Sequence, residues 1–228
     1  MPEIAVRLRS IEERIAVAAA SAGRDASSVR LVAVSKTFPV EAVRDAYAAG
    51  QRDFGENKVQ EALEKIVSSA DLPIRWHLLG HLQTNKVKDA LELFDVIHSL
   101  DRLELAQELE RRAAPRGLAV EAMLQVNVGG EASKGGFAPD GVGQALEAIG
   151  KLAHVKVTGL MAIPPEVERP EDARPWFRQL RELAERHGLA RLSMGMSGDF
   201  EVAVEEGATM VRVGTAIFGS RPPLGTRA

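Results

Sequence analysis

Eight short apolar runs, each followed by a segment with helical periodicity, constrain the fold of this chain more than any other feature. The runs do not alternate strictly between apolar and polar residues, which indicates strands covered on both faces, as in a parallel sheet. The runs predict strands at Arg30–Ser35, Arg52–Asn57, Arg75–Gly80, Asp95–Leu100, Ala119–Asn127, Val155–Ile163, Arg191–Ser197 and Thr209–Gly214.

Helices are predicted between these strands from apolar spacing and from residues typical of helix ends. Pro39 opens the first of them and Gly50 ends it, following the preference for proline at helix starts and glycine after helix ends. An amphipathic helix at the N-terminus precedes the first strand. A final helical turn follows the last strand, and the other helices are predicted at Lys58–Ser69, Lys86–Leu93, Asp101–Ala113, Asp140–Gly150, Glu171–His187 and Asp199–Glu206.

Eight strand–helix units within roughly 200 residues predict an α/β protein, a single (β/α)8 TIM barrel with an extra N-terminal helix. The barrel would occupy residues 1–228 as one domain. A doubly wound open sheet is the alternative, and the absence of a Gly-x-Gly-x-x-Gly motif after the first strand counts against it. The proline-rich stretch Pro164–Pro175 is expected to be a loop between strand and helix, not a domain boundary.

The composition excludes several kinds of function. The chain has no cysteine, which rules out disulfides, cysteine-ligated zinc and thiol nucleophiles. The formal net charge is −3, and no basic stripe indicates a nucleic-acid partner. Charges interrupt the N-terminal segment and no apolar run reaches the roughly 18 residues of a membrane span, so we expect a cytoplasmic protein without a membrane partner. The histidines lack the close spacing of metal ligands, so no metal is predicted.

Lys36 is the first candidate for chemistry, because it ends the first predicted strand. Active sites of β/α barrels lie at the carboxyl ends of the strands. The apolar neighbours Val32, Val34 and Phe38 make a charged amine costly there, and desolvation favours the neutral amine, which attacks aldehydes. The alternative is a lysine that extends into solvent from the strand end.

Two turns near the C-terminus predict a phosphate site. Ser197–Gly198 follows the seventh strand and Gly214–Thr215 follows the eighth, and each pairs glycine with a hydroxyl residue at a helix start. Backbone N–H groups at helix starts bind phosphate, and the loops after strands seven and eight are the usual phosphate site of this fold. Ordinary helix capping by Ser197 and Thr215 is the alternative.

Other polar residues lie in or just after the predicted strands. Arg212 shares strand periodicity with Met210 and Gly214, and a buried guanidinium needs either a ligand or a neighbouring carboxylate as its partner. Asn57 is expected to bind a ligand or to cap the following helix. His77 is expected to contact the ligand, with a hydrogen-bonded core histidine as the alternative.

Several segments, taken in order, resemble the pyridoxal phosphate homeostasis proteins. The resemblance covers nearly the whole chain, and the ordered set is specific to that family. It implies a barrel that binds pyridoxal 5′-phosphate (PLP), similar to the N-terminal domains of alanine racemase and eukaryotic ornithine decarboxylase. The segments are LVAVSK, FGEN followed by VQEAL, WHLLGHLQTNK, IHSLD, LQVNVGGEASKGG, GLMAI and LSMGMSGDFEVAVEEGATMVRVGTAIFG.

The resemblance also implies roles for single residues. Lys36 matches the lysine that forms a Schiff base with PLP, Arg212 the arginine that faces the pyridine nitrogen, and Asn57 a polar residue near the ring hydroxyl. Lys58 stands where the family usually has tyrosine, which changes the electrostatics of that edge. The phosphate-binding turns and the lining of the pocket are matched by Ser197, Gly214, Thr215, Met194 and Met196.

From these features we expect a PLP carrier rather than an enzyme. A cationic Arg212 beside the pyridine nitrogen disfavours its protonation and weakens the electron sink that PLP enzymes use. Little chain follows the last strand, which leaves no room for the second domain that supplies a base in racemases. The only tyrosine, Tyr47, falls in the first barrel helix.

The expected function is PLP homeostasis, in which a monomer holds the cofactor on Lys36 and delivers it to PLP-dependent apo-enzymes. Lys134, in a glycine-rich loop, is a candidate for a transient second acceptor of the cofactor. Two alternatives stay open. One is a racemase-like PLP enzyme of weak or unknown activity, and the other is a class I aldolase, whose reactive lysine usually lies on a later strand.

Overall fold

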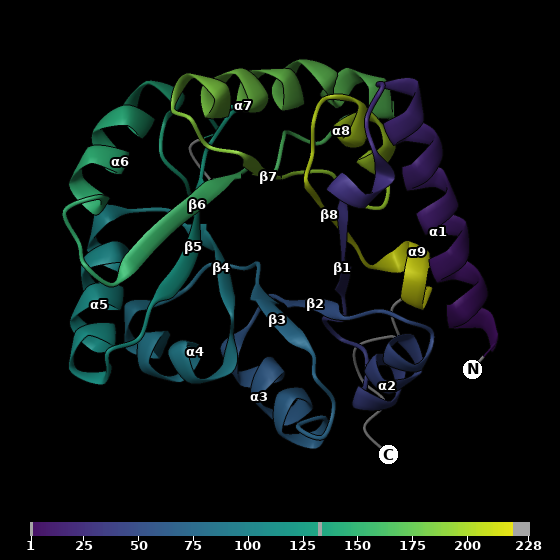
Figure 1. Cartoon of the computed structure of the whole chain (residues 1–228), viewed down its shortest axis with the longest axis horizontal. Coiled ribbons are helices and arrows are strands. Elements are labelled where there is room, and N and C mark those ends of the chain that lie inside the picture. Colours follow the sequence, from purple (N-terminus) through teal and green to yellow (C-terminus); the bar gives the residue numbers. More distant parts are fainter. Residues whose placement is uncertain (1, 132–133, 221–228) are drawn as a thin grey trace.

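The structure, a computed structural model, describes residues 2–131 and 134–220. Eight parallel strands close into one barrel in chain order, with helices around the outside (Figure 1). This confirms the predicted (β/α)8 barrel and excludes an open sheet. The strands are β1 Arg30–Val34, β2 Asp53–Glu56, β3 Arg75–Leu78, β4 Val96–Leu100, β5 Val120–Gln125, β6 Val155–Met161, β7 Arg191–Ser193 and β8 Met210–Val213.

The helices that follow the strands begin and end close to the predicted residues. The helix predicted from Asp101 begins at Leu103 in α5, with Arg102 at the N-cap position and no side-chain cap. The carboxylate of Asp101 is instead hydrogen-bonded to His81, at 2.7 Å, and to Arg102. The helices are α2 Val40–Ala48, α3 Val59–Ser68, α4 Val87–Leu93, α5 Leu103–Ala113, α6 Val142–Ile149, α7 Arg174–Arg186, α8 Phe200–Glu205 and α9 Thr215–Phe218.

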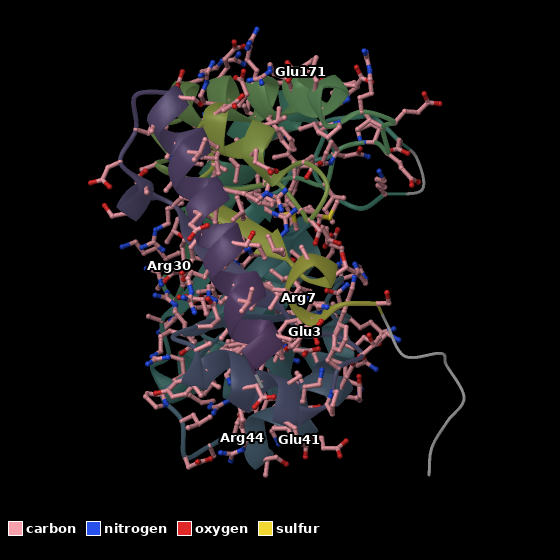
Figure 2. The ribbon with its side chains drawn as sticks, turned by 90° about the vertical axis from the view of Figure 1, so that its right-hand side faces the viewer. Glu3, Arg7, Arg30, Glu41, Arg44 and Glu171 are labelled. Atoms are coloured by element: carbon pink, nitrogen blue, oxygen red, sulfur yellow. The ribbon has the colours of Figure 1, made fainter. Side chains whose placement is uncertain are left out.

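The predicted extra N-terminal helix, α1 Pro2–Ser21, lies outside the ring formed by the other helices, next to α8 and α9 (Figure 1). Leu8, Ile11 and Ile15 form its buried stripe at helical spacing and pack into the main core. Figure 2 shows the helix crossing that side of the molecule, with the ion-paired Glu3 and Arg7 one turn apart. The helix therefore covers the seam of the barrel where β8 meets β1.

The strands bury both faces, which accounts for their apolar runs without strict alternation. The main core lies between the outward faces of the strands and the helices. Inside the barrel, Val96, Met123, Met161 and Met210 form a second, smaller apolar cluster. Part of the interior is polar, and these polar side chains lead to the site described below.

Of the helices in the described ranges, none combines the length and the apolar character needed to cross a membrane. Within the same ranges, no three His, Asp or Glu side chains gather as metal ligands would. The cytoplasmic location and the lack of a metal stay predictions from the sequence.

Candidate functional site

A cavity of about 260 Å³ opens at the carboxyl ends of the strands, where β/α barrels place their active sites. Residues of the first two strand–helix loops form one side of it, and the loops after β6, β7 and β8 form the other. Six of the eight predicted cofactor-binding residues line this cavity: Lys36, Asn57, Ser197, Arg212, Gly214 and Thr215.

The turn that carries Lys36 is strained. Thr37, the next residue, has a φ of 69°, which is unfavourable for a β-branched side chain. Its backbone N–H donates to the carboxylate of Glu61 on α3, and the N–H of Phe38 donates to the carbonyl of Ser35 at 3.1 Å. Backbone strain that the surroundings hold in place is typical of functional sites. Here it fixes the point from which the Lys36 side chain enters the cavity.

A buried ion pair supports this turn from below. Lys65 on α3 lies 2.6 Å from Glu56 on β2, and their side chains are 8% and 0% exposed. The Lys65 ammonium also donates to the carbonyl of Ser35 at 2.7 Å, and the Ser35 hydroxyl donates to Glu56 at 2.7 Å. Burial raises the pKa of Glu56, although Lys65 counteracts the rise. This network was not predicted from the sequence, although Lys65 falls on the same face of the predicted helix as the apolar Val59 and Ala62.

Arg212 is a buried cation at the base of the cavity, 4% exposed. Its Nη1 donates to Ser193 Oγ at 2.7 Å and its Nη2 donates to the carbonyl of Ala162 at 2.9 Å. Among the described residues no carboxylate forms an ion pair with it. Burial lowers the pKa of Arg212 to about 10, and the charge of Asp199 acts in the opposite direction. Because such a cation is costly, its presence indicates an electron-rich ligand in this cavity.

Behind Arg212 a chain of hydrogen bonds runs through the barrel interior. Ser193 Oγ lies 2.8 Å from His98 Nδ1, His98 Nε2 lies 2.8 Å from His77 Nδ1, and His77 Nε2 lies 2.9 Å from Asp53 Oδ1. The Asp53 carboxylate only accepts, so His77 donates to it from Nε2, His98 donates from Nε2 to His77 Nδ1, and the Ser193 hydroxyl donates to His98 Nδ1. Burial, together with the charge of Arg212, holds the pKa of His98 well below its usual range.

Two of the predicted cofactor-binding residues do not line the cavity. His77 shares a strand face with Leu79, two residues further on, so Leu79 reaches the cavity and His77 lies one layer deeper. Met194 follows the inward-facing Ser193 and therefore points outward into the main core, where it is fully buried. Met196, the other methionine of this segment, lines the cavity as expected.

The two glycine-containing turns meet on one side of the cavity. The backbone N–H of Gly214 donates to Ser197 Oγ at 3.3 Å, and that of Ala216 donates to the same oxygen at 3.5 Å. A Cβ on Gly214 would lie 3.1 Å from the carbonyl of Val34, so a larger residue would crowd β1. The Ser197 hydroxyl thus lies where two N–H groups converge, with Thr215 alongside in the cavity wall, and a phosphate oxygen in its place would accept from the same N–H groups.

A second cavity of about 470 Å³ adjoins the first and shares Ile163, Met196 and Gly198 with it. We call it the vestibule; its other lining residues include Lys134, Pro164, Glu166 and Glu168. The Lys134 ammonium lies 2.5 Å from the carboxylate of Glu131 and donates to the carbonyl of Pro164 at 3.0 Å. Lys134 therefore lies in the wall of the vestibule and not in the cavity that Lys36 enters.

A third cavity, of about 240 Å³, lies at the opposite end of the barrel, where the strands begin. Figure 2 shows Arg30 at that end. Arg30 lies 2.9 Å from Asp53, Arg75 lies 2.8 Å from Glu121, and Arg191 is also ion-paired with Glu121. Each of these arginines has a carboxylate partner, as expected for a structural network.

The chain belongs to the alanine racemase N-terminal domain family, whose pattern matches residues 6–222. An alanine racemase of Clostridium difficile shares the fold, with a TM-score of 0.74 at 15% identity over 98% of this chain and 58% of that one.

Within this fold class, the chain belongs to the pyridoxal phosphate homeostasis proteins. It is 48% identical to the protein of that name from Aquifex aeolicus over 94% of this chain and 97% of that one, and 49% identical to that of Pseudomonas aeruginosa over 97% of each. PipY of Synechococcus elongatus, whose structure has been solved with PLP bound, is 42% identical over 95% of this chain and 100% of its own, with a TM-score of 0.81. The resemblance found in the sequence is thereby confirmed.

Proposed function

We propose that this protein binds PLP through a Schiff base on Lys36 and serves in PLP homeostasis. One observation carries the proposal: Lys36, the unpaired buried Arg212 and the N–H donors of the last turn lie in the walls of a single cavity. The size of that cavity suits one small ligand. The names of the curated relatives and the PLP bound to PipY support the same function.

Each wall of the cavity has its own part in holding the cofactor. Lys36 supplies the amine that bonds the aldehyde carbon, and Arg212 directs its N–H groups toward the ring nitrogen. Asn57 lies within reach of the ring hydroxyl side. The phosphate is held by the turns that contain Ser197, Gly214 and Thr215.

Arg212 makes a carrier a better fit than an enzyme. PLP supplies an electron sink when it is bound, and that sink is strongest with a protonated ring nitrogen. The fixed charge of Arg212 disfavours that protonation. We therefore propose that the protein shields the reactive aldehyde and passes PLP to apo-enzymes. Measuring α-proton exchange over a panel of amino acids tests the racemase-like alternative, which requires exchange faster than with free PLP.

The direct test is the visible absorbance spectrum of the protein mixed with PLP. The expected result is a yellow protein that, after borohydride reduction and peptide mapping, carries the adduct on Lys36. A protein that takes up no PLP contradicts the proposal, and an adduct on another lysine contradicts the assignment of Lys36. Sedimentation analysis of the same sample tests the predicted monomer.

A further inference from the structure

The vestibule lies beside the cavity that Lys36 enters. It shares Ile163, Met196 and Gly198 with the cavity that Lys36 enters, so a molecule arriving from this side passes over these residues. Ile163 and Met196 are 37% and 39% exposed, and they are two of only six large apolar side chains exposed among the described residues. The vestibule therefore offers an apolar floor directly beside the cofactor cavity.

The charged groups of the vestibule are mostly acidic. Glu166 and Glu168 are exposed, and neither has an ion-pair partner within the described ranges. The one cation in the lining, Lys134, is already paired with Glu131. The neighbouring Arg169 is paired with Asp172 at 2.6 Å. The opening thus attracts ammonium groups and repels carboxylates.

We propose that the vestibule selects the amine that removes PLP from Lys36, admitting the side-chain amine of a lysine in an acceptor polypeptide and disfavouring free amino acids. This inference rests on the proposed function. A free amino acid carries a carboxylate beside its amine, and Glu166 and Glu168 repel it. A lysine side chain carries no carboxylate, and its aliphatic stem suits the apolar floor formed by Ile163 and Met196.

The transfer step needs no further reactant. The acceptor nitrogen bonds to the aldehyde-derived carbon of the cofactor while the bond from that carbon to Lys36 Nζ breaks. As the imine double bond moves to the acceptor nitrogen, both protons of the neutral acceptor amine pass to Lys36 Nζ, which leaves as a free amine. No water is consumed and nothing is oxidised or reduced.

The test follows the loss of PLP from the loaded protein by absorbance, with alanine and alaninamide as matched probes. Each rate is divided by the rate of the same amine with free PLP, which removes differences in intrinsic reactivity. We expect the normalised rate for alaninamide to exceed that for alanine by about three- to tenfold at low salt, as two nearby carboxylates would produce. Nα-acetyl-lysine amide is expected to behave like alaninamide.

The double variant Glu166→Gln/Glu168→Gln is expected to bring this ratio close to one, and salt is expected to do the same. The charge-matched control is Glu64→Gln/Glu182→Gln, at exposed positions of α3 and α7 that line neither cavity, and it should keep the wild-type ratio. Equal normalised rates in the wild type, or a ratio that the vestibule variant leaves unchanged, overturn the inference. PLP titration of each variant separates these outcomes, since a protein that binds no PLP contradicts the proposed function instead.

Discussion

The two ends of the barrel both carry arginine side chains, but they treat the arginine charge differently. At the end where the strands begin, Arg30, Arg75 and Arg191 all have carboxylate partners. At the end where the strands finish, Arg212 is almost completely buried, and within the described residues its guanidinium hydrogen-bonds only to a hydroxyl and a carbonyl. A paired charge is already satisfied by the protein, whereas an unpaired buried charge leaves interaction energy for a ligand. The comparison therefore separates a structural end from a ligand-binding end.

The largest expected effect is at Lys36. Replacing it in Lys36→Ala removes the only amine among the described residues that line the cofactor cavity, so the visible absorbance and the borohydride-stable adduct should disappear completely. The Lys134→Ala variant, in the wall of the vestibule, is the control and should retain both signals. An unchanged rate of PLP transfer in Lys134→Ala contradicts the predicted role of that lysine as a second acceptor.

The next largest effect is expected from the buried pair beneath the Lys36 turn. Lys65→Met leaves the Glu56 carboxylate buried without its cation, which should lower the free energy of unfolding by about 3–5 kcal/mol. Chemical denaturation measures the loss. Adding Glu56→Gln to the same protein should restore much of it, and a double variant as unstable as the single one contradicts this account.

Arginine variants compare the two ends directly. Arg212→Met should weaken PLP binding at least about tenfold, or 1.4 kcal/mol. It should change the free energy of unfolding by less than about 1 kcal/mol, because loss of a buried charge offsets the lost hydrogen bonds. Arg191→Met should leave PLP binding unchanged and lower stability by about 0.5–1 kcal/mol, as for a partly exposed pair. If PLP titration and denaturation show the same profile for both variants, the distinction between the ends is wrong.

The last effect, absent at neutral pH, is a pH dependence that originates between the two ends. His98 stays neutral in the folded protein, while in the unfolded chain it takes up a proton below its ordinary pKa of 6.5. The free energy of unfolding should therefore fall as pH falls below 6.5, by about 1.4 kcal/mol per pH unit from this residue. In His98→Gln, denaturation between pH 7 and pH 5 should lack this contribution, and an unaltered slope contradicts it.

The features that sequence revealed are those that depend on local pattern. Periodicity located the eight strands, and the ends of those strands identified Lys36 and the turns at Ser197 and Gly214. Periodicity assigns a side chain to one face of a strand, but it does not say how far along the barrel axis that side chain lies. His77 was therefore expected in the cavity, whereas Leu79, on the same face, is the residue that lines it.

The rest of the site depends on how elements pack against one another. The pair formed by Lys65 and Glu56 exists because α3 lies against the outward face of β2, a lateral placement that neither segment encodes by itself. The strained Thr37 likewise depends on Glu61 reaching across from α3. Such contacts join residues that are separated along the chain, so no local motif marks them.

The hydrogen-bond chain through the barrel has a consequence for how this interior can evolve. Arg212 at one end only donates hydrogen bonds, and Asp53 at the other end only accepts them. Each group between them therefore accepts one hydrogen bond and donates one along the chain. Substitutions that keep one donor and one acceptor at a position, such as glutamine for histidine, preserve the direction of the whole hydrogen-bond chain. An apolar residue, or a side chain that can only accept hydrogen bonds, interrupts the hydrogen-bond chain at any position between Arg212 and Asp53. The interior therefore evolves as a unit and not residue by residue.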